Sequence, residues 1–217
     1  RYTDPSGHGL CEGWDCEEPE VPAGWPWRPP GHPGPTYASP EDLLTISEVH
    51  DLFELMAGLS GVAFGYVEDG CYARAHIMAT QMIERGVVPS KAWAFGHPSE
   101  PLEVRTSESR ITWWYHVAPA VLVEHGTTME YWVIDPSLFD RPVPAITWYG
   151  IMDNVAYERI TEWGQPVDIP IPWIKNRPFY EYQGGSGYWP GPDPPAGLDV
   201  HAAETMLHYC SICGCCQ

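Results

Sequence analysis

Glu68-Asp69-Gly70-Cys71-Tyr72-Ala73-Arg74-Ala75-His76 is the stretch that decides the fold. Its Asp-Gly pair is typical of a turn, and small or apolar residues then recur on one helical stripe, at Ala75, Met78 and Met82. With Asp69 as N-cap and Gly86 as a stop, the pattern predicts a helix over residues 70–85. Cys71 then lies in the first turn, where the helix dipole favours a thiolate, although a single cysteine on a helix is more often a packed core residue.

The composition limits the class of protein. The chain has 217 residues, enough for one sizeable core, and a net charge of −18. This charge would repel phosphate backbones, so we expect no nucleic-acid partner. The sequence contains no uninterrupted apolar run long enough to cross a bilayer, so we expect no membrane partner. The first residue is Arg1 rather than a methionine, which indicates a processed product. We expect a monomer that needs no cofactor.

The cysteines are distributed unevenly. Cys71 is alone in the middle of the chain, and six more lie near the termini, at positions 11, 16, 210, 213, 215 and 216. An even set plus one is typical of a disulfide-stapled protein with a free thiol, which predicts a secreted or otherwise extracytoplasmic protein. A zinc site in the tail is an alternative, because Cys210 and Cys213 form a Cys-x-x-Cys next to His208. Since no second pair of ligands is evident, we expect disulfides and no metal.

The chain divides into an arm and a domain. Residues 1–40 are acidic, rich in proline and glycine, and without helical or strand periodicity, so they are expected to form an irregular arm. Residues 41–217 are the candidate catalytic domain, with a cysteine-rich tail at 210–216. Ser39-Pro40-Glu41-Asp42 is typical of a helix start and predicts a helix to about residue 59. Further expected elements are an extended run at 62–67, a strand at 91–96, a short helix or strand at 146–151, an extended segment at 167–174 and a helix at 199–209.

Two adjacent strands are predicted in the middle of the domain. Residues 110–123 alternate in character, and residues 129–135 form the second strand after a turn at 124–127. Pro119 is expected to mark a bulge or an edge. A hairpin centred between positions 125 and 126 would place His116 directly opposite Asp135. Helices followed by an antiparallel sheet indicate the α+β class.

Cys71, His116 and Asp135 have the chemistry of a nucleophile, a general base and an orienting carboxylate. An imidazole next to a thiol forms a thiolate–imidazolium pair and later protonates the leaving amine. A carboxylate fixes the imidazole tautomer and stabilises its charged form. The backbone N–H of Cys71, at the helix start, is a candidate oxyanion donor. One residue of each type occurs in most chains, so this spacing alone is a moderately specific signal.

The motifs around these residues resemble those of the bacterial protein-glutaminase family. The similar segments are Asp69-Gly70-Cys71-Tyr72-Ala73-Arg74-Ala75-His76, Tyr115-His116-Val117-Ala118 and Ile134-Asp135-Pro136-Ser137-Leu138-Phe139. The family comprises secreted enzymes that convert protein-bound glutamine to glutamate, with a fold similar to the transglutaminase core. The resemblance implies a papain-like arrangement of helices on an antiparallel sheet, with Cys71, His116 and Asp135 as the catalytic residues. It also implies a γ-glutamyl thioester on Cys71, formed with release of ammonia and hydrolysed by water.

Other readings stay open at this point. Tyr72, Trp113, Trp114 and Trp148 are candidates to bind the glutamine side chain of a protein or peptide substrate, and ordinary core packing is the alternative for each. The same three catalytic groups could serve a transglutaminase, which uses an amine in place of water, or a cysteine peptidase. A non-catalytic module could also keep the fold. Arg74 is expected to form a structural ion pair, and His76 to lie off the Cys71 face of the helix.

Overall fold

The computed structural model describes residues 43–97, 99–105, 110–165, 167, 188 and 196–214. The described elements, in chain order, are β1 (Leu44–Thr45), α1 (Ile46–Ala57), α2 (Cys71–Glu84), β2 (Ser90–Gly96), β3 (Leu102–Arg105), β4 (Arg110–Trp113), β5 (Tyr115–His125), β6 (Thr128–Val133), β7 (Val143–Pro144), α3 (Ala145–Gly150), β8 (Val155–Thr161) and α4 (Leu198–Cys213). Helices packed on a largely antiparallel sheet make this an α+β fold, as the sequence predicts.

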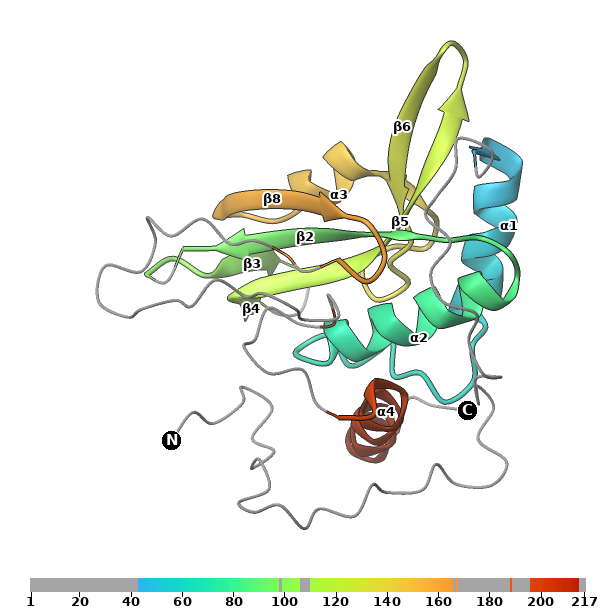
Figure 1. The fold of residues 1–217 in the computed structure, drawn as a ribbon. Helices are drawn as coiled ribbons and strands as arrows, with labels where there is room; N and C mark the ends of the chain where they lie inside the picture. The colour runs from blue at the N-terminus through green and yellow to red at the C-terminus, as the bar shows by residue number, and fades with distance from the viewer. Residues whose placement is uncertain are drawn as a thin grey trace.

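The main sheet has the order β7-β6-β5-β2-β8, and β1 adds a short parallel pairing to the end of β5. Strands β3 and β4 form a separate two-stranded ribbon. Figure 1 shows that α2 lies between this sheet and α4, while α1 stands at one end of the sheet. Every residue from Cys71 through Met82 is buried, which is what a helix covered on both sides requires. The element that the sequence places at the centre of the fold is therefore central in space as well.

The β5–β6 hairpin differs in register from the prediction. His125 pairs with Thr128, so the turn is centred between Gly126 and Thr127, one residue later than the predicted centre between positions 125 and 126. Gly126 has φ +67°, the left-handed conformation that a tight hairpin needs. The residue numbers of each β5–β6 pair now add up to 253, whereas the predicted hairpin required 251. His116 is therefore not directly opposite Asp135. Asp135 lies beyond the last residue of β6, so its position relative to His116 is set by the turn that follows the strand.

Pro119 explains where the hairpin ladder ends. It lies in the interior strand β5, paired with Lys91 of β2, so the expected bulge or edge is wrong. On the β6 side its carbonyl accepts a hydrogen bond from Ile134 N at 2.9 Å, but a proline has no N–H to return. The ladder between β5 and β6 therefore closes with one bond instead of two. The chain is free to leave the sheet at the next residue, Asp135.

Four local predictions are corrected by the structure. The helix α1 begins at Ile46 with Thr45 and Glu48 as a capping box, while the predicted start at Ser39 lies outside the described residues. The N-cap of α2 is Gly70, not Asp69. Residues 62–67 form successive turns rather than an extended run. The predicted strand at 110–123 is divided at Trp114 into β4 and β5.

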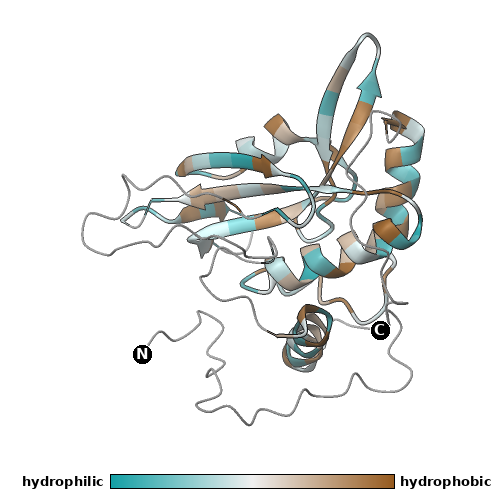
Figure 2. Ribbon diagram, viewed as in Figure 1, coloured by the Kyte–Doolittle hydropathy of each residue, from teal (hydrophilic) through white to brown (hydrophobic). Residues whose placement is uncertain are grey.

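The hydropathy of the elements follows their positions. Figure 2 shows that α1 alternates between hydrophilic and hydrophobic residues, as a helix with one buried face should. Within the described part of the chain, no helix is long and apolar enough to cross a membrane.

The predicted arm at 1–40 lies outside the described residues, as do residues 168–174 of the predicted extended segment and the last cysteines of the tail. The predicted short helix at 146–151 and the helix at 199–209 are present as α3 and α4.

Candidate active site

Cys71 is the first residue of α2, and the residue before it fixes the entry of the chain. Gly70 has φ +78°, and a Cβ at this position would lie 2.6 Å from Cε2 of Tyr209. Both the left-handed backbone and this close approach require glycine. The turn delivers Cys71 to the helix N-terminus as a free thiol with only 5% of its surface exposed.

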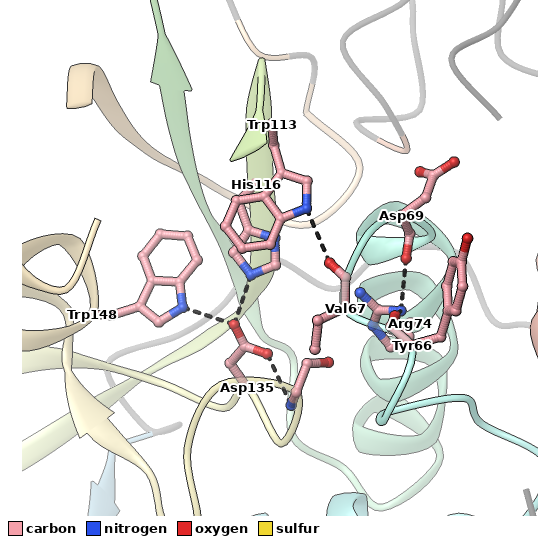
Figure 3. A network of polar contacts seen from close by, with 9 residues as sticks. Tyr66, Val67, Asp69, Arg74, Trp113, His116, Asp135 and Trp148 are labelled. Atoms are coloured by element: carbon pink, nitrogen blue, oxygen red, sulfur yellow. Dashed lines mark hydrogen bonds and ion pairs between the residues drawn. The ribbon is translucent and has the colours of Figure 1, made fainter. Parts of the chain in front are cut away.

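His116 and Asp135 are brought together despite the change of register. His116 Nε2 and Asp135 Oδ2 are 2.8 Å apart, and their side chains are 2% and 3% exposed. The carboxylate is itself held by a turn, because Ser137 N donates to Asp135 Oδ1 at 3.2 Å and Leu138 N donates to the Asp135 carbonyl at 3.1 Å. The turn that follows the end of the β5–β6 ladder thus aims this carboxylate back at β5 (Figure 3).

The His116 ring is enclosed by two tryptophans. Trp113 stacks on it with 4.9 Å between ring centroids, and Trp148 lies 5.4 Å away, tilted by 16° and 23° respectively. Trp148 Nε1 donates to Asp135 Oδ2 at 2.9 Å, and Trp113 Nε1 donates to the carbonyl of Val67 at 3.0 Å. Figure 3 shows the indoles and the carboxylate arranged around the imidazole. They leave this ring little freedom to rotate.

The environment favours a charged His116. Burial lowers the pKa of His116, but the charge and hydrogen bond of Asp135, together with Cys71, outweigh burial and raise the pKa to about 9. Burial also raises the pKa of Asp135, yet the charge and hydrogen bond of His116, the Trp148 hydrogen bond and the charge of Arg74 hold it below its ordinary value. The pair is therefore an imidazolium and a carboxylate at neutral pH.

The second nitrogen of the ring, Nδ1, is not used by Asp135. Nδ1 of His116 is buried and has no hydrogen-bond partner among the described residues, while Cys71 is near enough to contribute to the raised pKa of the imidazole. Nε2 is occupied by Asp135. Nδ1 is thus the atom that is available to exchange a proton with the Cys71 sulfur or with a group bound to it.

The four predicted substrate-binding residues have separate positions. Trp113 and Trp148 contact His116, and Trp148 has no exposed surface. Trp114 is half-buried and packs edge-on against Tyr115, 4.7 Å away. Tyr72 is buried on α2 and packs against the ring of Tyr188 at 5.3 Å. The two indoles next to His116 pack on the imidazole, and substrate binding by any of the four residues stays a prediction.

The contacts of Arg74 differ from the prediction, whereas His76 lies where the sequence predicts. Arg74 Nη1 donates to three backbone carbonyls of the segment before α2, those of Ala63, Tyr66 and Asp69, at 3.3, 2.7 and 2.8 Å. Its expected ion pair is therefore replaced by a carbonyl cluster, and the guanidinium holds together the loop that precedes Cys71. His76 lies away from the nucleophile, where Nε2 is 2.7 Å from Asp199 Oδ1 of α4.

Two features were missed in the sequence. Lys91 is buried on β2 with Nζ 4.9 Å from the ring centroid of Trp163, and burial lowers its pKa to about 7, opposed only in part by the charge of Cys71. The alternation of side chains along a strand places Lys91 on the same face as Trp93, and this pattern could have indicated that Lys91 is buried. Asp69, expected as a cap, instead accepts hydrogen bonds from Gly70 N at 2.6 Å and from Tyr209 of α4 at 2.7 Å. That second contact had no local signal.

The tail cysteines differ from Cys71. Cys210 and Cys213 are disulfide-bonded, whereas Cys71 is a free thiol. Which cysteines they pair with lies outside the described residues, so the predicted pairing stays a prediction. In the described ranges, no group of three or more histidine, cysteine, aspartate or glutamate side chains is arranged to hold a metal ion.

Comparison with known proteins points in the same direction as the motifs. Residues 49–152 match a family model described as "Glutaminase". The protein-glutaminase of Chryseobacterium proteolyticum, solved by NMR, is 27% identical over 59% of this chain and 77% of its own, with a TM-score of 0.52. The A47Q2 mutant of pro-protein-glutaminase, a crystal structure, is 28% identical over 55% of this chain, with a TM-score of 0.50. No curated protein matches the sequence significantly.

The matched regions are partial on both sides. The chain covers 48% of the length of the pro-protein-glutaminase, and the family model ends near the C-terminus of α3. All three of Cys71, His116 and Asp135 fall inside residues 49–152. The resemblance to the protein-glutaminase family that the three motifs indicated is thereby confirmed, in sequence over residues 49–152 and in fold over more than half of the chain.

Proposed function

We propose that this protein is a thiol amidohydrolase that converts glutamine side chains in proteins or peptides to glutamate, with Cys71, His116 and Asp135 as its catalytic residues. The observation that carries the proposal is the buried His116–Asp135 pair. Its Nδ1 has no hydrogen-bond partner in the part of the chain that the structure describes, and the raised pKa of the imidazole reflects Asp135 and a nearby thiol, Cys71, at a helix N-terminus. This pair lies inside the region that matches the glutaminase family. The solved relatives, which are named protein-glutaminases, supply the substrate class.

The first half-reaction forms a thioester. The Cys71 sulfur attacks the side-chain amide carbon of glutamine, and the amide oxygen becomes an oxyanion that the Cys71 N–H can stabilise. As the C–N bond breaks, the nitrogen leaves with the proton of His116 Nδ1, so ammonia is released. A γ-glutamyl thioester on Cys71 and a neutral imidazole are left.

The second half-reaction returns the enzyme to its starting state. Water attacks the thioester carbon while His116 Nδ1 accepts one of its protons. The C–S bond then breaks, glutamate is released, and the thiolate–imidazolium pair is restored. Asp135 stays ionised throughout, since it holds Nε2 and stabilises the positive ring. No metal or cofactor takes part in the proposed steps.

The setting of this activity is also a proposal. An even set of terminal cysteines and the secreted nature that the family resemblance implies fit a secreted monomer stapled by disulfides. An acidic protein of net charge −18 would work on neutral or basic substrate proteins. The arm at residues 1–40 and the domain at 41–217 are the proposed division of the chain.

The test is an incubation of the full chain with casein, in which ammonia, amine incorporation and new N-termini are measured together. We expect ammonia release with no cleavage and no cross-linking. The Cys71→Ala variant should keep its thermal unfolding temperature within a few degrees and lose ammonia release by more than about 10³-fold. New N-termini would identify a peptidase and incorporated amine a transglutaminase, and either would refute the deamidase. A fully active Cys71→Ala variant would refute the nucleophile.

A further inference from the structure

The helix α4 lies outside the matched family region, yet it contacts the turn that carries the nucleophile. Residues Leu198–Cys213 follow the end of the family match at 152 and pack on α2. The ring of Tyr209 stacks on Tyr66 with 4.3 Å between centroids and an angle of 15°. One turn of this helix therefore forms the back wall of the segment that leads into Cys71.

The helix α4 also makes a hydrogen bond to this segment, from Tyr209 to Asp69. Tyr209 donates its hydroxyl to Asp69 Oδ2 at 2.7 Å, and the other oxygen, Oδ1, accepts the Gly70 N–H at 2.6 Å. Arg74 Nη1 donates to the Asp69 carbonyl at 2.8 Å (Figure 3). The carboxylate is thus a link between a side chain of α4 and the backbone amide that immediately precedes the nucleophile.

The ring of Tyr209 also restricts the space around the turn. Tyr209 is 2% exposed, and its ring occupies the space that a side chain at position 70 would need. Burial and the Asp69 hydrogen bond raise the pKa of the Tyr209 phenol, so it stays a donor at every pH of interest. The direction of the Cys71 N–H follows from the backbone angles of Gly70, and those angles are held by Asp69 and Tyr209.

We infer that Tyr209 is a positioning residue for the reaction: through Asp69 it fixes the Gly70 turn and so the Cys71 thiol and its backbone N–H. The inference rests on the proposed function of Cys71. It assigns to the C-terminal helix a part in the site that residues 49–152 do not contain. A misplacement of about 1 Å by a residue remote from the chemistry can cost up to about 10²-fold in rate.

The direct test is the Tyr209→Phe variant, which keeps the ring on Tyr66 and removes only the hydroxyl. We expect kcat for ammonia release from casein to fall about ten-fold, with KM within two-fold of the unchanged protein. The matched control is Thr205→Val on the same helix, where a buried hydroxyl that donates only to the His201 carbonyl is lost. This control should leave kcat unchanged. Equal kcat in Tyr209→Phe and the unchanged protein would overturn the inference.

Two further readouts separate positioning from general stability. If Tyr209 acts through Asp69, adding Asp69→Asn to Tyr209→Phe should lower kcat no further than Asp69→Asn alone; independent, additive losses would overturn the inference. Amide hydrogen exchange at Gly70 and Cys71 should be about ten-fold faster in Tyr209→Phe, and unchanged exchange would also overturn it. Exchange needs no turnover, so a protein that releases no ammonia would refute the proposed function alone and leave this test of Tyr209 intact.

Discussion

Asp135→Asn should alter the way the stability of the protein depends on pH. In the native state His116 has a pKa of about 9, against 6.5 for the unperturbed group. At 1.36 kcal/mol per pKa unit this corresponds to about 3 kcal/mol of stabilisation. Because the native pKa is the higher one, the full stabilisation is present below pH 6.5 and is lost as the pH rises towards 9. In the variant the charge of Asp135 is gone, burial dominates, and His116 is neutral over this window.

In the unchanged protein alone, a plot of the free energy of unfolding against pH would hide the contribution of His116. Lys91 has a native pKa of about 7 in place of 10.5, so its contribution has the opposite sign and stability from this group rises with pH above 7. Between pH 7 and 9 the two contributions oppose each other, and the total can look nearly flat. Only the difference between the unchanged protein and the variant isolates His116, since Lys91 is common to both.

The assay is equilibrium unfolding in urea at pH 6.5, 7.5, 8.5 and 9, for both proteins. We expect the variant to be less stable at pH 6.5, and the gap to narrow by about 3 kcal/mol as the pH reaches 9. Glu103→Gln is the matched control, because Glu103 is a 3%-exposed carboxylate that is bonded by Arg105 and Arg110. Its arginine partners do not titrate in this window. A gap for Asp135→Asn that is constant across pH, as expected for the control, would refute the raised pKa of His116.

Three more substitutions test the supports of the site. Gly70→Ala should lower the free energy of unfolding by at least about 2 kcal/mol, because a left-handed alanine costs about 1–2 kcal/mol and its Cβ would meet the Tyr209 ring. The measurement is urea unfolding, and a smaller loss would show that the turn can relax. Trp148→Phe keeps a ring over His116 but loses the indole donor to Asp135, so kcat for ammonia release should fall about ten-fold, and an unchanged kcat would remove Trp148 from the site. Thr45→Ala should cost about 1 kcal/mol through the α1 capping box and leave kcat as it was, as followed by urea unfolding and the same ammonia assay.

The sequence predicted the parts of the site that depend on local patterns. The helix at Cys71 was visible because its apolar stripe and its turn residues are adjacent in the chain. The likeness to protein-glutaminases was visible because three short motifs keep their residues and order. The proximity of His116 to Asp135 was predicted through a register that was wrong by two residues. In the structure Asp135 lies beyond β6, and the turn that begins at this residue brings its carboxylate to His116.

The contacts that the sequence did not predict are those between distant segments. Nothing near Asp69 indicates that Tyr209, 140 residues away, donates to it. Trp148 was a candidate for substrate contact because exposed and buried indoles look alike in a sequence, and its contact with Asp135 depends on how α3 packs beside β6. Pro119 was judged by its missing N–H alone, and its place beside the final ladder bond could be known only from the three-dimensional pairing.

The burial of Cys71 bears on how the chain acquires its native disulfides. On the proposal that the chain is secreted, one of its seven cysteines must be kept out of every thiol–disulfide exchange. Packing of α2 between the sheet and α4 leaves Cys71 5% exposed, whereas Cys213 is exposed at the end of α4. Exchange requires that an attacking sulfur reach its target, so α2 must pack before the tail oxidises if the nucleophile is to emerge unpaired. On the same proposal, the order of these two folding events decides whether Cys71 ends as a free thiol or in a wrong disulfide.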